Sequence, residues 1–184
     1  MKARWLLVAL LWLACSRPQR DDCGQGERVV DPILLAFLSQ ARSAHHIADQ
    51  REQQGDVEAA LRALQGLTQG PAPPGNPPEA GEVLADTRAR IADLLSRAGR
   101  FDQAELEIAA GLASSKAPSY FRGHLFEVRG LLEERREKAL RTSGREAEAN
   151  QARERSLSAY EEAMKLQAEV IQGAARGAPS GPAP

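Results

Sequence analysis

One spacing of four residues occurs twice in the chain and restricts its fold more than any other feature. Each copy has an alanine, a glycine seven residues later, a second alanine at twelve and a large aliphatic residue at sixteen. The two copies are Ala48, Gly55, Ala60 and Leu64, and Ala92, Gly99, Ala104 and Ile108. Small residues let two helices approach closely, and glycine readily adopts the backbone conformations at which a chain reverses. The spacing therefore predicts two similar helical hairpins, offset by 44 residues.

The composition favours helices along the whole chain. Its 184 residues are rich in Ala, Leu, Arg, Glu and Gln, which are good helix formers. It lacks the runs of β-branched residues that mark strands. The length corresponds to one domain with tails. We therefore expect an all-α protein with one helical domain over residues 31–172.

Apolar residues at helical spacing, separated by turn residues, divide this domain into three hairpins. The hairpins are expected over residues 31–69, 79–115 and 119–172. Residues 69–81 contain five prolines and form a loop. Residues 173–184 are expected to be a disordered tail.

The third hairpin is expected to be longer than the others. Each of its arms has about 24 residues and would measure about 36 Å at 1.5 Å per residue. Its midsection, "EERREKALRTSGREAEANQARER", is charged on nearly all sides and fits either a solvated two-helix arm or an interaction arm. In its last helix the apolar residues are concentrated in the second half: Leu157, Tyr160, Met164, Ala168 and Ile171.

The hairpin pattern resembles the tetratricopeptide repeat, a 34-residue unit of two antiparallel helices. The second hairpin carries the resemblance best, with Ile91-Ala92-x-x-Leu95 in its first helix and Phe101-x-x-Ala104-x-x-x-Ile108 in its second. The first hairpin departs from the pattern because Arg51 replaces a large apolar residue. The resemblance implies a right-handed stack of hairpins, an α-solenoid, and the alternative is an unrelated helical bundle. Three repeats are about the minimum for such a stack.

The N-terminus has the layout of a secretory signal. Lys2 and Arg4 precede an apolar run from residue 5 to residue 14. A membrane-spanning helix needs about twenty apolar residues. Charged residues end this run too early for that: Arg17, Arg20, Asp21 and Asp22.

The end of the apolar run, "LWLAC", resembles the lipobox of bacterial lipoproteins. Ala14 and Cys15 match the pattern and Leu13 is tolerated, whereas Trp12 departs from the usual leucine. The resemblance implies removal of residues 1–14 and diacylation of the Cys15 sulfur. Residues 15–30 would then be the lipidated cysteine and a flexible tether. Plain secretion and an uncleaved anchor are the alternatives.

Compartment and cysteine chemistry follow from this lipobox resemblance. Ser16 after the lipidated cysteine implies delivery to the outer membrane, with the protein facing the periplasm. A lipidated Cys15 has no sulfur left for a disulfide or a metal. Cys23, the second of the two cysteines, would then be a lone thiol in an oxidising compartment.

The sequence contains no grouping typical of an enzyme or a metal site. The adjacent His45 and His46 point about 100° apart on a helix, and His124 stands alone. Ser114 and Lys116 resemble a nucleophile and a base only superficially, since they precede Pro118 at a helix end. The net charge of −1 and 4% aromatic residues disfavour nucleic acid as a ligand. We expect no enzyme activity, cofactor, metal or small-molecule substrate.

The sequence therefore predicts a membrane-anchored adaptor or scaffold that binds a protein or peptide through the first helices of its hairpins. Candidate binding residues are Gln40, Arg51, Arg88 and Arg90. Some lipoproteins of this repeat family help to assemble envelope complexes, which suggests a similar role. The alternative is a structural envelope lipoprotein whose long hairpin acts as a spacer and which has no peptide groove.

Overall fold

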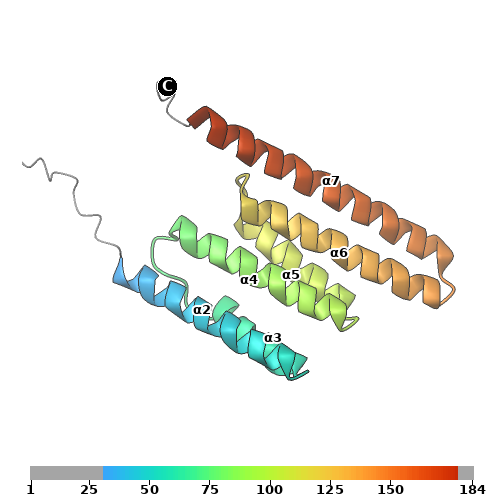
Figure 1. Ribbon diagram of the computed structural model, residues 1–184, viewed down its shortest axis with the longest axis horizontal. Helices are drawn as coiled ribbons and strands as arrows, with labels where there is room; N and C mark the ends of the chain where they lie inside the picture. The colour runs from blue at the N-terminus through green and yellow to red at the C-terminus, as the bar shows by residue number, and fades with distance from the viewer. Residues whose placement is uncertain (1–30, 178–184) are drawn as a thin grey trace, which may run out of the picture. The chain divides into compact units, whose positions relative to one another are not determined.

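The computed structural model describes residues 31–177, and within them the chain is all-α, as expected. This part contains six helices and no strand (Figure 1). The helices are α2 (Pro32–Gln53), α3 (Val57–Thr68), α4 (Pro78–Arg97), α5 (Phe101–Ser114), α6 (Tyr120–Thr142) and α7 (Glu146–Gly177). Helix α7 runs five residues past position 172, where the tail was expected to begin.

Side chains at the helix starts explain where several helices begin. Asp31 and Asp56 precede α2 and α3 and accept hydrogen bonds from the backbone N–H groups of Ile33 (2.8 Å) and Ala59 (2.9 Å). Ser119 caps α6 in the same way. Such caps satisfy N–H groups that have no partner within the helix.

The turns that end α2, α4 and α6 share one geometry. Gly55, Gly99 and Gly144 occupy them with φ of 76°, 75° and 72°, a conformation that glycine adopts without strain. In each turn the N–H of the next residue donates to the carbonyl five residues earlier. The pairs are Asp56 to Arg51, Arg100 to Leu95 and Arg145 to Leu140, with N–O distances of 2.9 Å. This is the Schellman hydrogen-bond pattern, present at all three turns.

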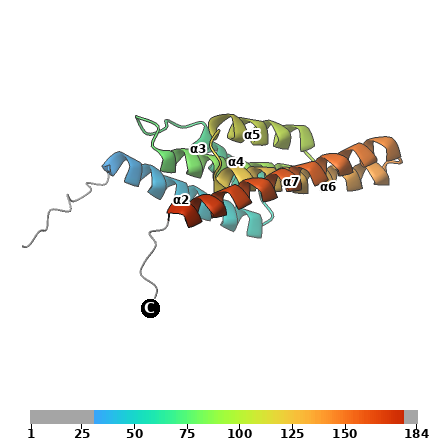
Figure 2. The ribbon, with the colours of Figure 1, turned by 90° about the horizontal axis from the view of Figure 1, so that it is seen from above.

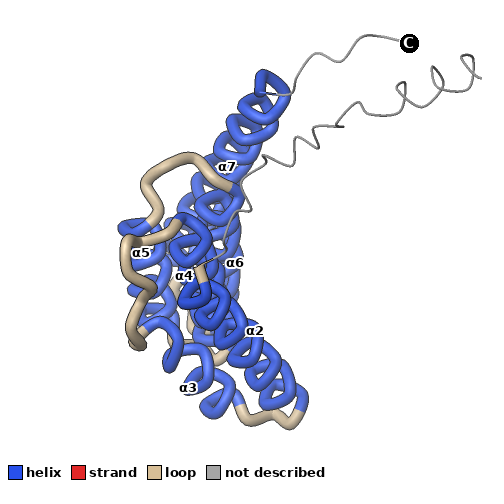
Figure 3. Tube along the Cα trace, turned by 90° about the vertical axis from the view of Figure 1, so that its left-hand side faces the viewer, coloured by secondary structure: helices blue, strands red, loops and turns tan. Residues whose placement is uncertain are grey.

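Consecutive helices pack as pairs, α2 with α3, α4 with α5 and α6 with α7. Helix α4 also contacts α2, α3 and α6, and α5 contacts α6. Figure 3 shows α3 and α5 on one side and α2 and α6 on the other, with α4 between them. The main core lies around α4 and includes Leu61, Ile91, Ile108 and Leu125, all fully buried.

The third pair is longer than the others. The joined ends of α6 and α7 extend beyond the turn between α4 and α5 (Figures 1 and 2). Residues 141–148 at this tip are all exposed. The inner face of α7 consists mainly of small residues: Ala149, Ala152, Ser156, Ala159, Ala163 and Leu166.

The apolar residues identified in the last helix are mostly not in this inner face. Leu157, Met164, Ala168 and Ile171 are exposed, and only Tyr160 is half-buried. The reason lies in α6, where Gly123 lets the backbone of α7 approach closely and Gly130 leaves room for the Tyr160 ring. A close approach favours small residues at the contact, so alanines rather than the bulkier side chains are buried.

Candidate partner-binding groove

A groove of about 450 Å³ crosses the first helices of all three pairs. Helix α4 forms its centre, and α2 and α6 form its sides. Its lining residues are His45, Glu52, Asp86, Ala89, Arg90, Asp93, Arg97, His124, Val128 and Leu131. On α4 these positions recur every three or four residues, so one face of that helix lines the groove.

A chain of ion pairs crosses one end of the groove. Arg90 contacts Asp49 at 2.5 Å and Glu52 at 2.6 Å. Glu52 also pairs with Arg97 at 2.7 Å, and Arg97 contacts Asp93 at 3.1 Å. The alternation of charges joins α2 to α4 and leaves each of these residues with an opposite charge beside it.

Arg135 extends the ion-pair chain to α6. Its guanidinium donates to Asp93 at 2.8 Å and to the Ser96 hydroxyl at 2.5 Å. Three helices are therefore linked by charge across this end of the groove. Burial opposes ionisation of Glu52, but hydrogen bonds from Arg90 and Arg97 outweigh it and lower the pKa of Glu52.

The other end of the groove has a carboxylate without an ion-pair partner in the described part of the chain. Asp86 forms no ion pair within residues 31–177, although it is half-buried in the groove wall. His45 lies near it, with Nε2 3.0 Å from the Thr87 hydroxyl. Because that hydroxyl donates to the Val83 carbonyl at 2.7 Å, Nε2 carries the proton and donates to Thr87 Oγ1.

His45 is a neutral neighbour for Asp86. Burial lowers the pKa of His45, and this outweighs the opposing effect of Asp86. The imidazole therefore does not neutralise the carboxylate at pH 7. On α6, His124 stacks against the Tyr120 ring, with ring centroids 6.1 Å apart. This end of the groove thus presents a negative charge beside aromatic and imidazole rings.

The four candidate residues from the sequence do not come together. Arg90 lies in the groove, whereas Arg88 faces the other side of α4 and pairs with Glu107 of α5 at 2.7 Å. Two residues of helix separate these arginines by about 200°. Gln40 is exposed on α2, and Arg51 is exposed with a hydrogen bond to Gln54.

Sequence reasoning missed Asp86, His45 and His124 as groove residues. Asp86, Arg90, Asp93 and Arg97 are three or four residues apart, a spacing that places charged side chains on one helix face. That pattern could have indicated a charged surface on α4. The positions of both histidines depend on how α2 and α6 pack against α4, which no local pattern encodes.

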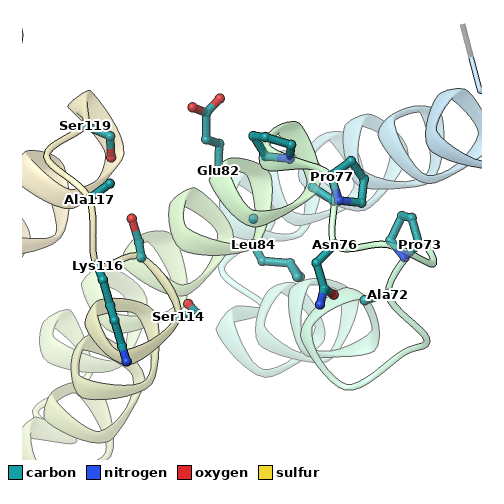
Figure 4. Close-up of a pocket in the computed structure, with 14 residues that line it drawn as sticks. Ala72, Pro73, Asn76, Pro77, Glu82, Leu84, Ser114, Lys116, Ala117 and Ser119 are labelled. Carbon is teal, nitrogen blue, oxygen red and sulfur yellow. The ribbon is translucent and has the colours of Figure 1, made fainter.

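A second cavity, of about 510 Å³, lies between the proline-rich loop and the segment joining α5 to α6 (Figure 4). Ser114 and Lys116 line it, but the Ser114 hydroxyl donates to the Gly111 carbonyl at 2.9 Å. Figure 4 shows Lys116 extending away from Ser119. Within the described chain, no hydrogen bond joins Lys116 to either serine. The arrangement does not form an activated nucleophile.

Residues 31–177 contain no group of three or more His, Cys, Asp or Glu side chains placed to hold a metal ion. None of their helices has an apolar stretch long enough to cross a bilayer. Cys15 and Cys23 lie outside the described residues.

The chain matches none of the protein-family models, curated proteins or solved structures with which it was compared.

Proposed function

We propose that this protein is a lipid-anchored adaptor whose groove over α2, α4 and α6 binds a segment of a partner protein. The observation that carries the proposal is the groove itself, because the first helix of every pair contributes to it. A surface built by three successive helices suits an extended peptide or a helix better than a small molecule. We propose no enzyme activity for it.

Within this proposal the six helices form a right-handed tetratricopeptide-like stack. Two observations support it. The turns inside the three pairs share the same glycine conformation and hydrogen bonds. The long third pair therefore joins its two helices in the same way as the first two pairs. In addition, α4 contacts both α2 and α6, as neighbouring first helices do in such a stack.

The charges of the groove favour a basic partner segment. Its arginines already have carboxylate partners, whereas Asp86 has none within the described chain. A lysine or arginine that entered beside Asp86 would neutralise a half-buried charge, and the rings of Tyr120 and His124 lie on the adjoining helix. The partner is therefore proposed to be a protein with an exposed Lys- or Arg-containing segment.

The anchor is proposed to be a lipidated Cys15 on the periplasmic face of the outer membrane. Each buried CH₂ of an acyl chain contributes about 0.8 kcal/mol, so several chains hold a protein without any protein contact. The tether of residues 15–30 would then separate the groove from the bilayer. An envelope complex is the proposed setting of the adaptor.

A charge reversal in the groove tests this function. The full chain, carrying an epitope tag, would be purified from crosslinked cell envelopes. We expect a stoichiometric partner that Asp86→Lys removes, since the new charge repels a basic segment. Asp86 has no ion pair to lose within residues 31–177, so the variant should fold.

The matched control is Glu169→Lys, the same reversal of charge at an exposed site on α7. It should retain the partner. A partner kept by Asp86→Lys, or no partner for any version, would show that the groove is not the binding site.

A further inference from the structure

Helix α7 carries a row of large apolar side chains that the described chain leaves largely exposed. Leu157, Met164 and Ile171 are 48%, 70% and 69% exposed. They are seven residues apart, so they lie nearly in line over about 21 Å of helix. Large apolar residues at this spacing are typical of a helix that packs along a second helix. We call these three residues the α7 stripe.

The stripe is separate from the face that α7 turns to α6. That inner face is made of buried residues such as Ala152, Ala159 and Ala163. At 100° per residue, the stripe lies about 110° around the helix from the centre of the inner face. Helix α7 therefore has two apolar faces, of which only one is covered within residues 31–177.

The C-terminal part of α7 also lacks support from its own chain. A Cβ added at Gly123, near the start of α6, would lie 3.3 Å from Gln167 Cγ. Helix α6 begins three residues before Gly123, so the part of α7 beyond about residue 170 continues past the start of α6, and α7 extends beyond α6 in Figure 1. Residues 171–176 are all exposed. Helix ends without packed neighbours fray easily, so this end of α7 would gain stability from a neighbour.

The distribution of charges along the stripe indicates which neighbour fits. One edge of the stripe carries, in chain order, Glu154, Glu161, Lys165 and Arg176. These four positions fall within about 60° on a helix. Within this arc the edge is acidic before Met164 and basic after it, and Lys165 also lies 3.8 Å from Glu162 of its own helix. In an antiparallel pair this edge lies beside the same edge of the second α7, so each acidic half lies beside a basic half. In a parallel pair this edge would face the opposite edge of the second helix, and the match would be lost.

The three apolar residues of the α7 stripe also match themselves in an antiparallel pair. Leu157 and Ile171 are each seven residues from Met164. In an antiparallel pair centred on Met164, the Met164 side chains of the two copies lie beside each other. Leu157 of each copy then lies beside Ile171 of the other copy. A surface that matches itself under a two-fold rotation is what a symmetric dimer requires.

We propose that the α7 stripe is the interface of a homodimer, with two α7 helices packed antiparallel about Met164. The occupant of the stripe is thus a second copy of this chain. The groove is on α2, α4 and α6, so either proposal can fail without the other.

Site-directed crosslinking tests the geometry in intact cells. With Cys23→Ser as background, Met164→Cys should give a disulfide-linked dimer on oxidation. Leu157→Cys or Ile171→Cys alone should not, because the equivalent positions would be about 21 Å apart, beyond disulfide reach. Coexpression of these two variants should give a linked dimer.

The control for crosslinking is Leu106→Cys on α5, because Leu106 is also 70% exposed. It should remain monomeric, as should the background alone. Self-linking by all three stripe variants would indicate a parallel pair and overturn the proposal. Absence of a link at Met164 would overturn it as well.

Sedimentation of the full chain in density-matched detergent tests the energetics. Met164→Lys should weaken dimerisation at least about tenfold, or about 1.4 kcal/mol, and Leu106→Lys should leave it unchanged. Glu161→Lys should also weaken it, and adding Lys165→Glu should restore it by exchanging the charges. A monomer at all concentrations, or equal effects of Met164→Lys and Leu106→Lys, would contradict the interface.

Discussion

At the scale of single residues, Tyr160 of α7 occupies space that a glycine leaves free on α6. Its ring lies so close to Gly130 that a Cβ there would be 2.5 Å from Tyr160 Cε1. Burial, and then the carboxylate of Glu134, raise the pKa of Tyr160 from 10.0 to about 12. Both effects disfavour the charged phenolate.

This shift predicts a loss of stability in alkali. The folded protein retains the Tyr160 proton at pH values where the unfolded chain releases it. The stabilising effect is therefore complete below pH 10 and is lost as the pH rises toward 12. Urea unfolding across this range should show the decline in the free energy of unfolding. Tyr160→Phe should have a flatter profile, and parallel profiles would contradict the role of Tyr160.

The two arginines of α4 that the sequence indicated as binding residues show how far single site residues could be predicted. Arg90 lies in the groove, whereas Arg88 pairs with Glu107 behind α4. Sequence identified the helix that forms the centre of the groove but not which of its faces lines it. That depends on which neighbours pack on each face, and both faces of α4 carry charged residues.

At the scale of helices, the contact between α6 and α7 depends on the glycines of α6. Gly130→Ala would force the new methyl group against the Tyr160 ring. We expect the free energy of unfolding to fall by about 1–3 kcal/mol, as in other overpacked interiors. Urea unfolding measures the change.

A matched glycine on α7 provides the control. A Cβ at Gly173 would meet no atom within 4 Å. Gly173→Ala should therefore be neutral or stabilise the helix by up to about 1 kcal/mol. Replacing Tyr160 by Leu in the Gly130→Ala protein should recover part of the lost stability. Equal effects at the two glycines would rule out the steric explanation.

Local sequence signals predicted which segments form helices better than they predicted which face of each helix is buried. The all-α class is confirmed, and Gly55 and Gly99 lie at turns as expected. In α7, however, the bulky residues suggested an apolar face while the alanines form the buried one. Both sets recur at helical spacing. Packing against α6 decides between them, because Gly123 lets α7 approach closely and Gly130 leaves room only for the Tyr160 ring.

At the scale of the whole molecule, the proposed anchor determines where the helical domain works. Cys15→Ala should leave the chain unprocessed, without lipid and outside the outer-membrane fraction. Mass spectrometry of the native N-terminus, with membrane fractionation, measures this. Cys23→Ala should keep the mass increment of the lipid and the location. An unchanged mass and location for Cys15→Ala would exclude lipidation at that residue.

The ion-pair chain across the groove has a mechanical consequence. The interior around α4 is held by closely packed apolar side chains, which resist deformation. The groove side is spanned instead by Arg90, Arg97 and Arg135 with their carboxylates. Partly exposed ion pairs exchange with water or with other charges at low cost. The helical domain should therefore bend more easily at the groove than at the core, and more so at high salt, so that a charged segment of the proposed partner could adjust the width of the groove.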